Sequence, residues 1–186
     1  MSVPSEKKTF LGFGLGAVQS GLMLFEAYKS TNFERFVILE VNADLVKDIR
    51  SNNCTITINT ATKKGIIKST ISGFEIYNPN DQNNLASIAS AIHEADEMAT
   101  AIPSTDFYDL GENSLARLLA ENLNPDKPQI LYASENNNYA AEILLDKVKA
   151  YTDERALGRF QTINTVIGKM GGVIQDDITV KELGLD

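Results

Sequence analysis

The 186-residue sequence has one cysteine, one histidine and no tryptophan. The single cysteine, Cys54, excludes an internal disulfide framework and a cysteine-based metal site. No apolar run reaches the roughly 20 residues of a membrane-spanning helix, and the polar residues 1–8 lack a signal-peptide core. Basic residues are few: 17 Lys and Arg against 25 Asp and Glu give a net charge of −8, which argues against nucleic-acid binding. We therefore expect a cytoplasmic protein without a metal, membrane or nucleic-acid partner.

The order of apolar segments predicts alternating strands and helices. Hydrophobic residues make up 43% of the sequence and charged residues 23%, which suits one domain with a real core. Alternation of this kind predicts a mainly parallel sheet with helices on both faces. The expected strands are 8–13, 36–41, 97–102, 129–133 and 160–167, and the expected helices are 17–29, 43–51, 85–92, 109–123 and 138–150. Two β-branched segments, 55–59 and 65–71, predict a small β-insertion, with which 73–77 is a candidate to pair.

A glycine-rich turn joins the first expected strand to the first expected helix. This strand–turn–helix layout is typical of dinucleotide-binding sites, where backbone N–H groups at the start of the helix hold a pyrophosphate. Two registers are open. Gly12-x-Gly14-x-x-Ala17 fits the glycine or alanine of the fingerprint's third position, and Gly14-x-Gly16-x-x-Gln19 does not. A turn that needs glycine only for its backbone angles is the alternative.

The second expected strand ends in an acid. Glu40 follows an apolar run and lies 26 residues after Gly14, close to the roughly 20 residues that separate the glycines from a ribose-binding acid. A carboxylate at this place accepts hydrogen bonds from the adenosine ribose and repels a 2′-phosphate. The spacing therefore favours NAD over NADP, although an ordinary solvated acid would give the same pattern.

Two later strand ends carry small or amide side chains. Residues 100–103 are small enough to leave room for a nicotinamide or its ribose. Asn136, which follows the strand 129–133, can donate its amide N–H to a substrate oxygen that gains negative charge. The alternative for Asn136 is a role as a helix cap.

With its glycine turn and these strand ends, most of residues 8–170 resembles the polyol-specific long-chain dehydrogenases, the family of mannitol dehydrogenases. Residues 14–21 resemble the family's phosphate turn, with Gln19 where its third glycine stands, and this supports the register that begins at Gly14. Residues 39–42 resemble its Asp-Val-Asn strand end, 99–102 its Thr-Thr-Ala-Val strand and 134–136 its Cys-Glu-Asn segment. Residues 164–170 lack the Asp-Arg pair that the family has there.

The resemblance implies a Rossmann-type, doubly wound α/β fold for residues 1–186, with 8–170 as its core, and NAD as cofactor. It implies interconversion of a polyol or polyol phosphate, of the mannitol 1-phosphate type, and a ketose by hydride transfer. Asn136 would help to form the oxyanion site. The residues implied in cofactor binding are Gly14, Gly16, Ala17, Val18, Gln19, Glu40, Asn42, Thr100, Ala101 and Ile102.

The family's catalytic lysine lies in a C-terminal helical domain, in a Lys-x-x-x-x-Asn-x-x-His motif that this sequence does not contain. The one histidine, His93, is far from any such motif, and Lys169 is more consistent with a solvated side chain than with a base. We therefore expect that this chain alone does not turn over polyols and that it self-associates through surface which the missing domain would cover. Two alternatives stay open: a free-standing NAD(H)-binding regulatory module, and another Rossmann class such as a methyltransferase-like domain.

Overall fold

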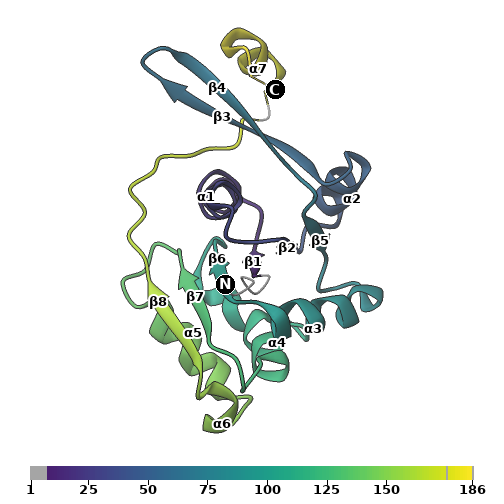
Figure 1. The fold of residues 1–186 in the computed structure, drawn as a ribbon, viewed down its shortest axis with the longest axis vertical. Coiled ribbons are helices and arrows are strands. Elements are labelled where there is room, and N and C mark those ends of the chain that lie inside the picture. Colours follow the sequence, from purple (N-terminus) through teal and green to yellow (C-terminus); the bar gives the residue numbers. More distant parts are fainter. Residues whose placement is uncertain (1–7, 175, 186) are drawn as a thin grey trace, which may run out of the picture.

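A single sheet organises the computed structural model, which describes residues 8–174 and 176–185 (Figure 1). In this described part, six strands lie in the order β5-β2-β1-β6-β7-β8, and every neighbouring pair is parallel. The strand order reverses between β1 and β6, so this is a doubly wound sheet with a switch point at its centre. The strands are β1 (Thr9–Phe13), β2 (Arg35–Leu39), β5 (Glu75–Tyr77), β6 (Glu97–Thr100), β7 (Gln129–Ala133) and β8 (Phe160–Asn164).

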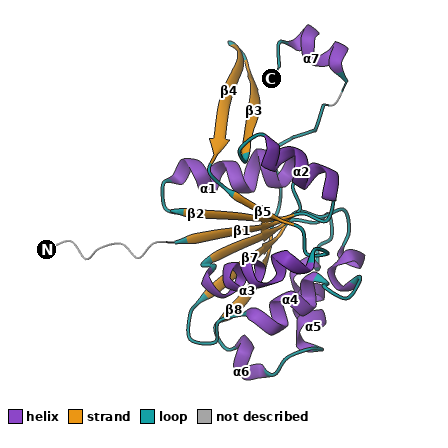
Figure 2. Cartoon of the chain, turned by 90° about the vertical axis from the view of Figure 1, so that its right-hand side faces the viewer, coloured by secondary structure: helices purple, strands orange, loops and turns teal. Residues whose placement is uncertain are grey.

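Helices cover both faces of the sheet, as Figure 2 shows. One face carries the helix that follows β1, a π-helical segment (Gln19–Leu24) continued by α1 (Phe25–Ser30), together with α2 (Ala43–Ser51). The opposite face carries α3 (Leu85–Glu94), α4 (Leu115–Asn122) and α5 (Ala140–Lys149). Two shorter helices, α6 (Glu154–Leu157) and α7 (Asp177–Leu183), lie beyond these layers.

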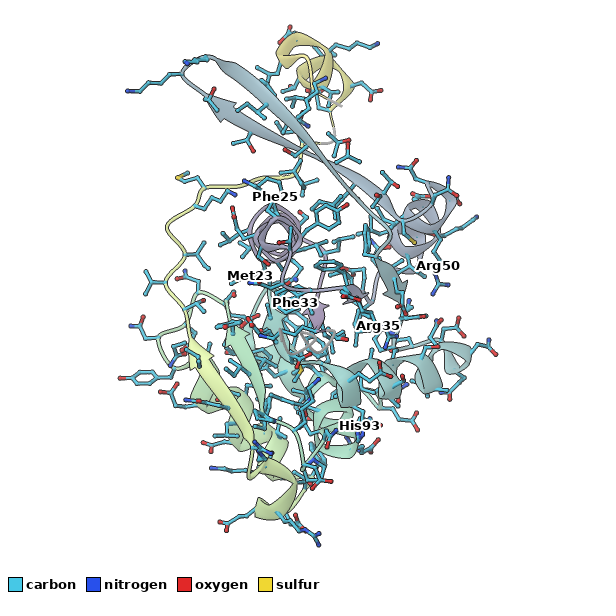
Figure 3. The ribbon with its side chains drawn as sticks, viewed as in Figure 1. Met23, Phe25, Phe33, Arg35, Arg50 and His93 are labelled. Carbon is cyan, nitrogen blue, oxygen red and sulfur yellow. The ribbon has the colours of Figure 1, made fainter. Side chains whose placement is uncertain are left out.

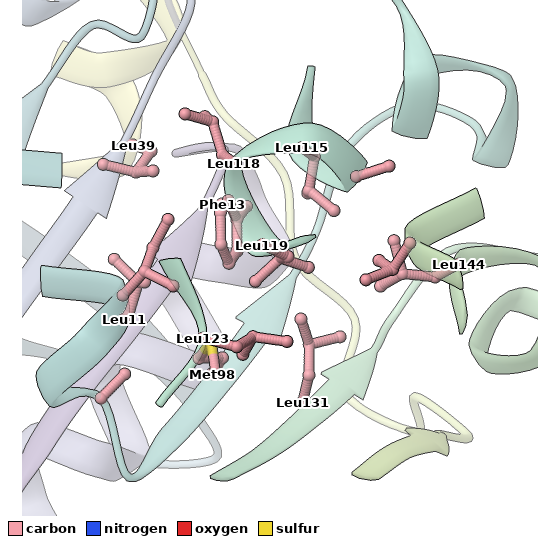
Figure 4. Packing of buried hydrophobic residues seen from close by; sticks show 14 of the residues in the cluster. Leu11, Phe13, Leu39, Met98, Leu115, Leu118, Leu119, Leu123, Leu131 and Leu144 are labelled. Atoms are coloured by element: carbon pink, nitrogen blue, oxygen red, sulfur yellow. The ribbon is translucent and has the colours of Figure 1, made fainter. Parts of the chain in front are cut away.

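Burial on both faces explains why the strands contain continuous apolar runs. All five residues of β1 are buried. Phe10 packs into the cluster under α1 and α2, whereas Leu11 and Phe13 pack into the cluster under α3, α4 and α5. Figure 4 shows this second cluster, to which Leu119 and Leu131 also belong. The predicted alternation of strands and helices is confirmed, and so is the parallel sheet.

The segment 73–77 differs from its prediction. The insertion is confirmed as an antiparallel hairpin of β3 (Thr55–Thr62) and β4 (Gly65–Ser72), which in Figure 2 projects from the face that carries α1 and α2. Pairing of 73–77 with this hairpin is wrong, because β5 pairs in parallel with β2 at the edge of the main sheet. Phe74 and Ile76 are 2% exposed, so burial of these two side chains, rather than closeness in sequence, places the strand.

Several further boundaries differ from the sequence pattern, and two of them have a clear local cause. The predicted helix 109–123 begins only at Leu115, because Gly111 takes a φ of 90° and Ser114 caps the helix by accepting the N–H of Arg117. The predicted strand 160–167 ends at Asn164, whose side chain accepts the N–H of Ala141 and so joins the start of α5. From there a coil, yellow in Figure 1, passes α1 toward the hairpin.

The helix that follows β1 packs over a strand glycine in an unusual way. Gln19 is fully buried, and among the described residues neither its amide oxygen nor its amide nitrogen has a hydrogen-bond partner. A Cβ built on Gly12 would lie 2.1 Å from Gln19 Nε2, so the missing side chain of Gly12 makes room for Gln19. A third glycine would let helix and strand approach closely. Here Gln19 fills that space, and a π-helical segment, a form that is rare and usually short, follows directly after the first helical residues.

This packing gives a coupling that can be measured. Gly12→Ala should destabilise the fold, because the new Cβ would overlap Gln19 Nε2 and come within 2.7 Å of Ile38 Cδ1. Gln19→Ala removes the first overlap, so the double variant should be more stable than the sum of the single effects by about 0.5–3 kcal/mol. Chemical denaturation of the four proteins measures the coupling. Gly21→Ala is the control, since beyond its own helix backbone its Cβ would meet no described atom within 4 Å. Additive single effects would contradict this account.

Candidate functional site

The segments singled out from the sequence meet at the carboxyl edge of the sheet. The last paired residues of the six strands are in register, and the ladder continues by one residue. Gly14 N–H donates to Leu39 O at 2.7 Å, and Ala101 N–H donates to Phe13 O at 3.0 Å. The residues that follow the strands therefore form one row across the edge: Asn78, Glu40, Gly14, Ala101, Ser134 and Thr165.

The turn after β1 needs its two glycines for different reasons. Gly14 has a φ of 83°, and a Cβ on it would lie 2.8 Å from Ala101 O, so only glycine fits at this position. Gly16 has an ordinary φ and is exposed, and no described atom lies within 4 Å of where its Cβ would be. The bare backbone of Gly16 thus leaves open space in front of the helix. Because Gly12 lies inside β1, the geometry favours the register that begins at Gly14.

Glu40 holds the glycine turn from the neighbouring strand end. Its Oε2 accepts the N–H of Leu15 at 2.8 Å, and its Oε1 accepts the N–H of Asn42 at 2.9 Å. Asn42 in turn caps α2 by accepting the N–H groups of Asp44 and Leu45, both at 3.1 Å. A carboxylate can accept about four hydrogen bonds, so Glu40 keeps acceptor capacity on its half-buried, solvent-facing side.

A cavity of about 410 Å³ lies on the same side of the switch point, between α2 and the loop that follows β5. Arg50, labelled in Figure 3, borders it and is fixed by hydrogen bonds to Ile76 O and Asn84 Oδ1. The sequence did not indicate this cavity, because the pattern of the loop 78–84 is that of a polar connection. The lining residues are Ala43, Val46, Lys47, Arg50, Ser51, Asn78, Asp81 and Asn84.

The other side of the switch point is organised by a residue that sequence reasoning passed over. Glu135 is 6% exposed and accepts hydrogen bonds from Thr100 Oγ1 at 2.8 Å, from the N–H of Ile102 at 3.0 Å and from Tyr108 Oη. Burial, and then the Glu135 carboxylate, raise the pKa of Tyr108. The neighbouring Asn136 is exposed at the edge. In the sequence, only the place of Glu135 next to Asn136 at a strand end pointed to it, and no pattern marked Tyr108.

The remaining predicted contacts fall into two groups. Ala17, Val18, Ala101 and Ile102 are partly exposed beside the glycine turn. Thr100 and Gln19 are fully buried, Thr100 on Glu135 and Gln19 beneath the helix, so their side chains do not reach the open edge.

His93 and Lys169, the two side chains considered as candidates for the catalytic base, lie away from this edge. His93, labelled in Figure 3, is exposed in the last turn of α3, next to the amino end of β6. Lys169 packs on α1, where its Nζ lies 4.7 Å from the centre of the Phe25 ring and 3.3 Å from Glu26 Oε1. Gly171 passes close to Ala17 at the start of the helix, so the coil that contains Lys169 crosses near the glycine turn.

Within residues 8–174 and 176–185, no group of three or more His, Cys, Asp or Glu side chains is placed to hold a metal ion. In the same residues, no helix is long and apolar enough to cross a membrane.

Comparison with known proteins bears on the fold. Neither a protein-family model nor a curated protein matches the sequence. Among solved structures, prephenate dehydrogenase from A. aeolicus, in complex with hydroxyphenyl propionate and NAD+, superposes with a TM-score of 0.51 at 11% identity, over 92% of this chain and 45% of that one. A short chain alcohol dehydrogenase from E. coli CFT073, complexed with NADH, gives a TM-score of 0.48 at 11% identity, over 87% of this chain and 37% of that one. This chain thus spans less than half the length of either protein. The likeness to prephenate dehydrogenase establishes the fold: the described chain is a Rossmann-type, doubly wound α/β domain.

Proposed function

We propose that this chain binds NAD(H) across the carboxyl edge of its sheet. The observation that carries the proposal is the turn Gly14–Gly16, which faces open space at the start of a helix and is held in place by Glu40. In a doubly wound sheet, the crevice outside the strand ends at the switch point is where ligands bind.

The residues present fit the pyrophosphate of a dinucleotide. The first N–H groups of a helix have no acceptor within it, and here they belong to residues beside the bare Gly16 backbone. These N–H groups and the positive end of the helix dipole favour an anion. Binding of this kind needs no lysine or arginine, which agrees with a chain of net charge −8.

Glu40 and the cavity fit the adenosine half. The free acceptor sites of Glu40 suit the two ribose hydroxyls, and its negative charge disfavours a 2′-phosphate. The cavity between α2 and the loop 78–84 lies next to Asn42, on the side of the switch point that carries Glu40. It provides a partly enclosed place for the adenine ring.

The finer proposal is that this domain is the cofactor half of a polyol or polyol-phosphate dehydrogenase of the mannitol 1-phosphate type. When bound, NAD supplies a hydride acceptor for alcohol oxidation. Ala101 and Ile102 would line the nicotinamide side, and the exposed Asn136 would donate its amide N–H to the substrate oxygen. The support is the order of motifs along the chain together with their meeting at one edge.

A second candidate is a stand-alone NAD(H)-binding module without catalysis. Alcohol oxidation needs a base that takes the hydroxyl proton. Neither His93 nor Lys169 lies at the carboxyl edge in the described part of the chain, and this favours the second candidate for the chain by itself.

The first test compares two cofactors by titration calorimetry. We expect NAD to bind at least about tenfold more tightly than NADP, because Glu40 repels the 2′-phosphate. Glu40→Gln should weaken NAD binding by roughly 1–3 kcal/mol and reduce the preference. Asp44→Asn is the matched control, since it removes the same charge from an exposed position one turn away. Equal affinity of the parent chain for both cofactors would refute the role of Glu40.

The second test concerns the glycine turn. Gly16→Val should abolish NAD binding while the protein stays folded, because the side chain has room in the free domain but fills the space that the pyrophosphate needs. Gly21→Val is the control, because its Cβ also meets no described atom within 4 Å beyond its own helix backbone, and it lies inside the helix. Unchanged NAD affinity of Gly16→Val would place the binding site elsewhere.

The third test distinguishes the two candidates. With NAD and mannitol 1-phosphate, mannitol or related polyols, we expect no NADH formation above background, because in the described residues neither His93 nor Lys169 lies at the carboxyl edge to take the hydroxyl proton. We also expect concentration-dependent self-association in light scattering, since Val166, Met170 and Ile178 expose most of their apolar side chains. Turnover that Asn136→Ala removes would show that a base lies within these residues.

A further inference from the structure

Glu135 is a buried carboxylate whose partners are all neutral. Thr100, Ile102 and Tyr108 donate to it. Taking a carboxylate out of water costs free energy, and hydrogen bonds to the charged oxygens offset this cost. An apolar side chain would fill the same place but would leave these buried donors unpaired, so the geometry that this acid imposes on its three donors is the feature to explain.

The three donors come from consecutive pieces of one loop. Thr100 is the last residue of β6, Ile102 lies in the loop beyond it, and Tyr108 lies in the short 3-10 helix Thr105–Asp109. Glu135 itself follows β7. One side chain therefore fastens the whole connection between β6 and α4 to the next strand end.

The arrangement repeats what Glu40 does on the other side of the switch point. Glu40 accepts the N–H of Leu15 at 2.8 Å, and Glu135 accepts the N–H of Ile102 at 3.0 Å. Each acid follows one strand and holds the backbone of the loop that follows the neighbouring strand. Glu40 is half-exposed and can touch a ligand, whereas Glu135 is buried and can act only through the loop.

We propose that Glu135 is a positioning residue for the nicotinamide half of the dinucleotide, which it serves by fixing the wall formed by Ala101 and Ile102. This inference rests on the proposed NAD(H) function. In this arrangement, Glu40 serves the adenosine half of the cofactor and Glu135 serves the nicotinamide half.

Two substitutions separate positioning from mere filling of space. In Glu135→Gln the amide oxygen can accept the N–H of Ile102, and the NH2 group can donate to the hydroxyl oxygens of Thr100 and Tyr108, because hydroxyl groups both donate and accept. In Glu135→Leu the volume is similar but all three bonds are lost. The glutamine variant should therefore restore what the leucine variant loses.

The experiment titrates NADH and ADP separately into the parent chain and its variants, by calorimetry and, for NADH, also by nicotinamide fluorescence. ADP lacks the nicotinamide and its ribose, so it reports on the adenosine half alone. We expect Glu135→Leu to weaken NADH binding about tenfold or more and to leave ADP binding within about twofold. Glu135→Gln should stay close to the parent for both ligands. Glu121→Leu, an exposed site on α4, is the control for the added apolar side chain.

Tyr108→Phe keeps the proposal testable if Glu135→Leu does not fold, because it removes one donor without changing the shape of the core. It should weaken NADH binding about threefold, leave ADP binding unchanged and speed hydrogen exchange of the Ile102 amide. Variants that bind NADH like the parent, or that lose ADP and NADH equally, would overturn the role of Glu135. If the parent chain binds neither ADP nor NADH, the proposed function fails, and this inference fails with it.

Discussion

The structure depends on one steric constraint: β1 must leave the centre of the sheet and enter a helix within a few residues. Gly14 makes this turn at a φ of 83°, pressed so closely against Ala101 that no side chain fits. The position of the helix follows from the turn. Two further constraints follow from the position of the helix. Gln19 packs over Gly12, and Glu40, at the end of β2, accepts the N–H of Leu15 in the turn. A side chain at Gly14 would therefore disturb helix, strand and loop together.

Acidic side chains stabilise this edge through backbone N–H groups rather than through cations. Glu40 and Glu135 hold Leu15 and Ile102, one on each side of the switch point. The described ion pairs, such as Arg35 with Glu75 at 2.7 Å, instead involve residues away from the glycine turn. Hydrogen bonds to backbone N–H groups fix both position and direction. An acidic chain can thus present N–H groups to an anion without a basic patch.

The sequence was sufficient for the parts of this fold that depend on local patterns. The buried strands, the helix 43–51 with its Asn42 cap, and the row of strand ends follow from apolar periodicity and turn residues. What it could not show depends on contacts between distant segments. The edge strand β5 has only three residues, and its place beside β2 comes from burial of Phe74 and Ile76. Glu135 carries no local signal of burial, because its donors lie as far as 35 residues away along the chain. The motif predicts that Gln19 contacts the cofactor, whereas packing against Gly12 places its side chain beneath the helix.

The central place of β1 has a consequence for how the domain is built. Residues through Tyr77 contain β1, β2 and β5 and the helices of one face, so half of the sheet is complete on that side. The other face of β1, with Leu11 and Phe13, gains its cover only with α3, α4 and β6, and the contact of Thr9 with Asp96 spans 87 residues. Long-range pairing of this kind slows folding and exposes intermediates. During synthesis, the nascent chain therefore carries an apolar face on β1 that stays uncovered until α3 and α4 have emerged.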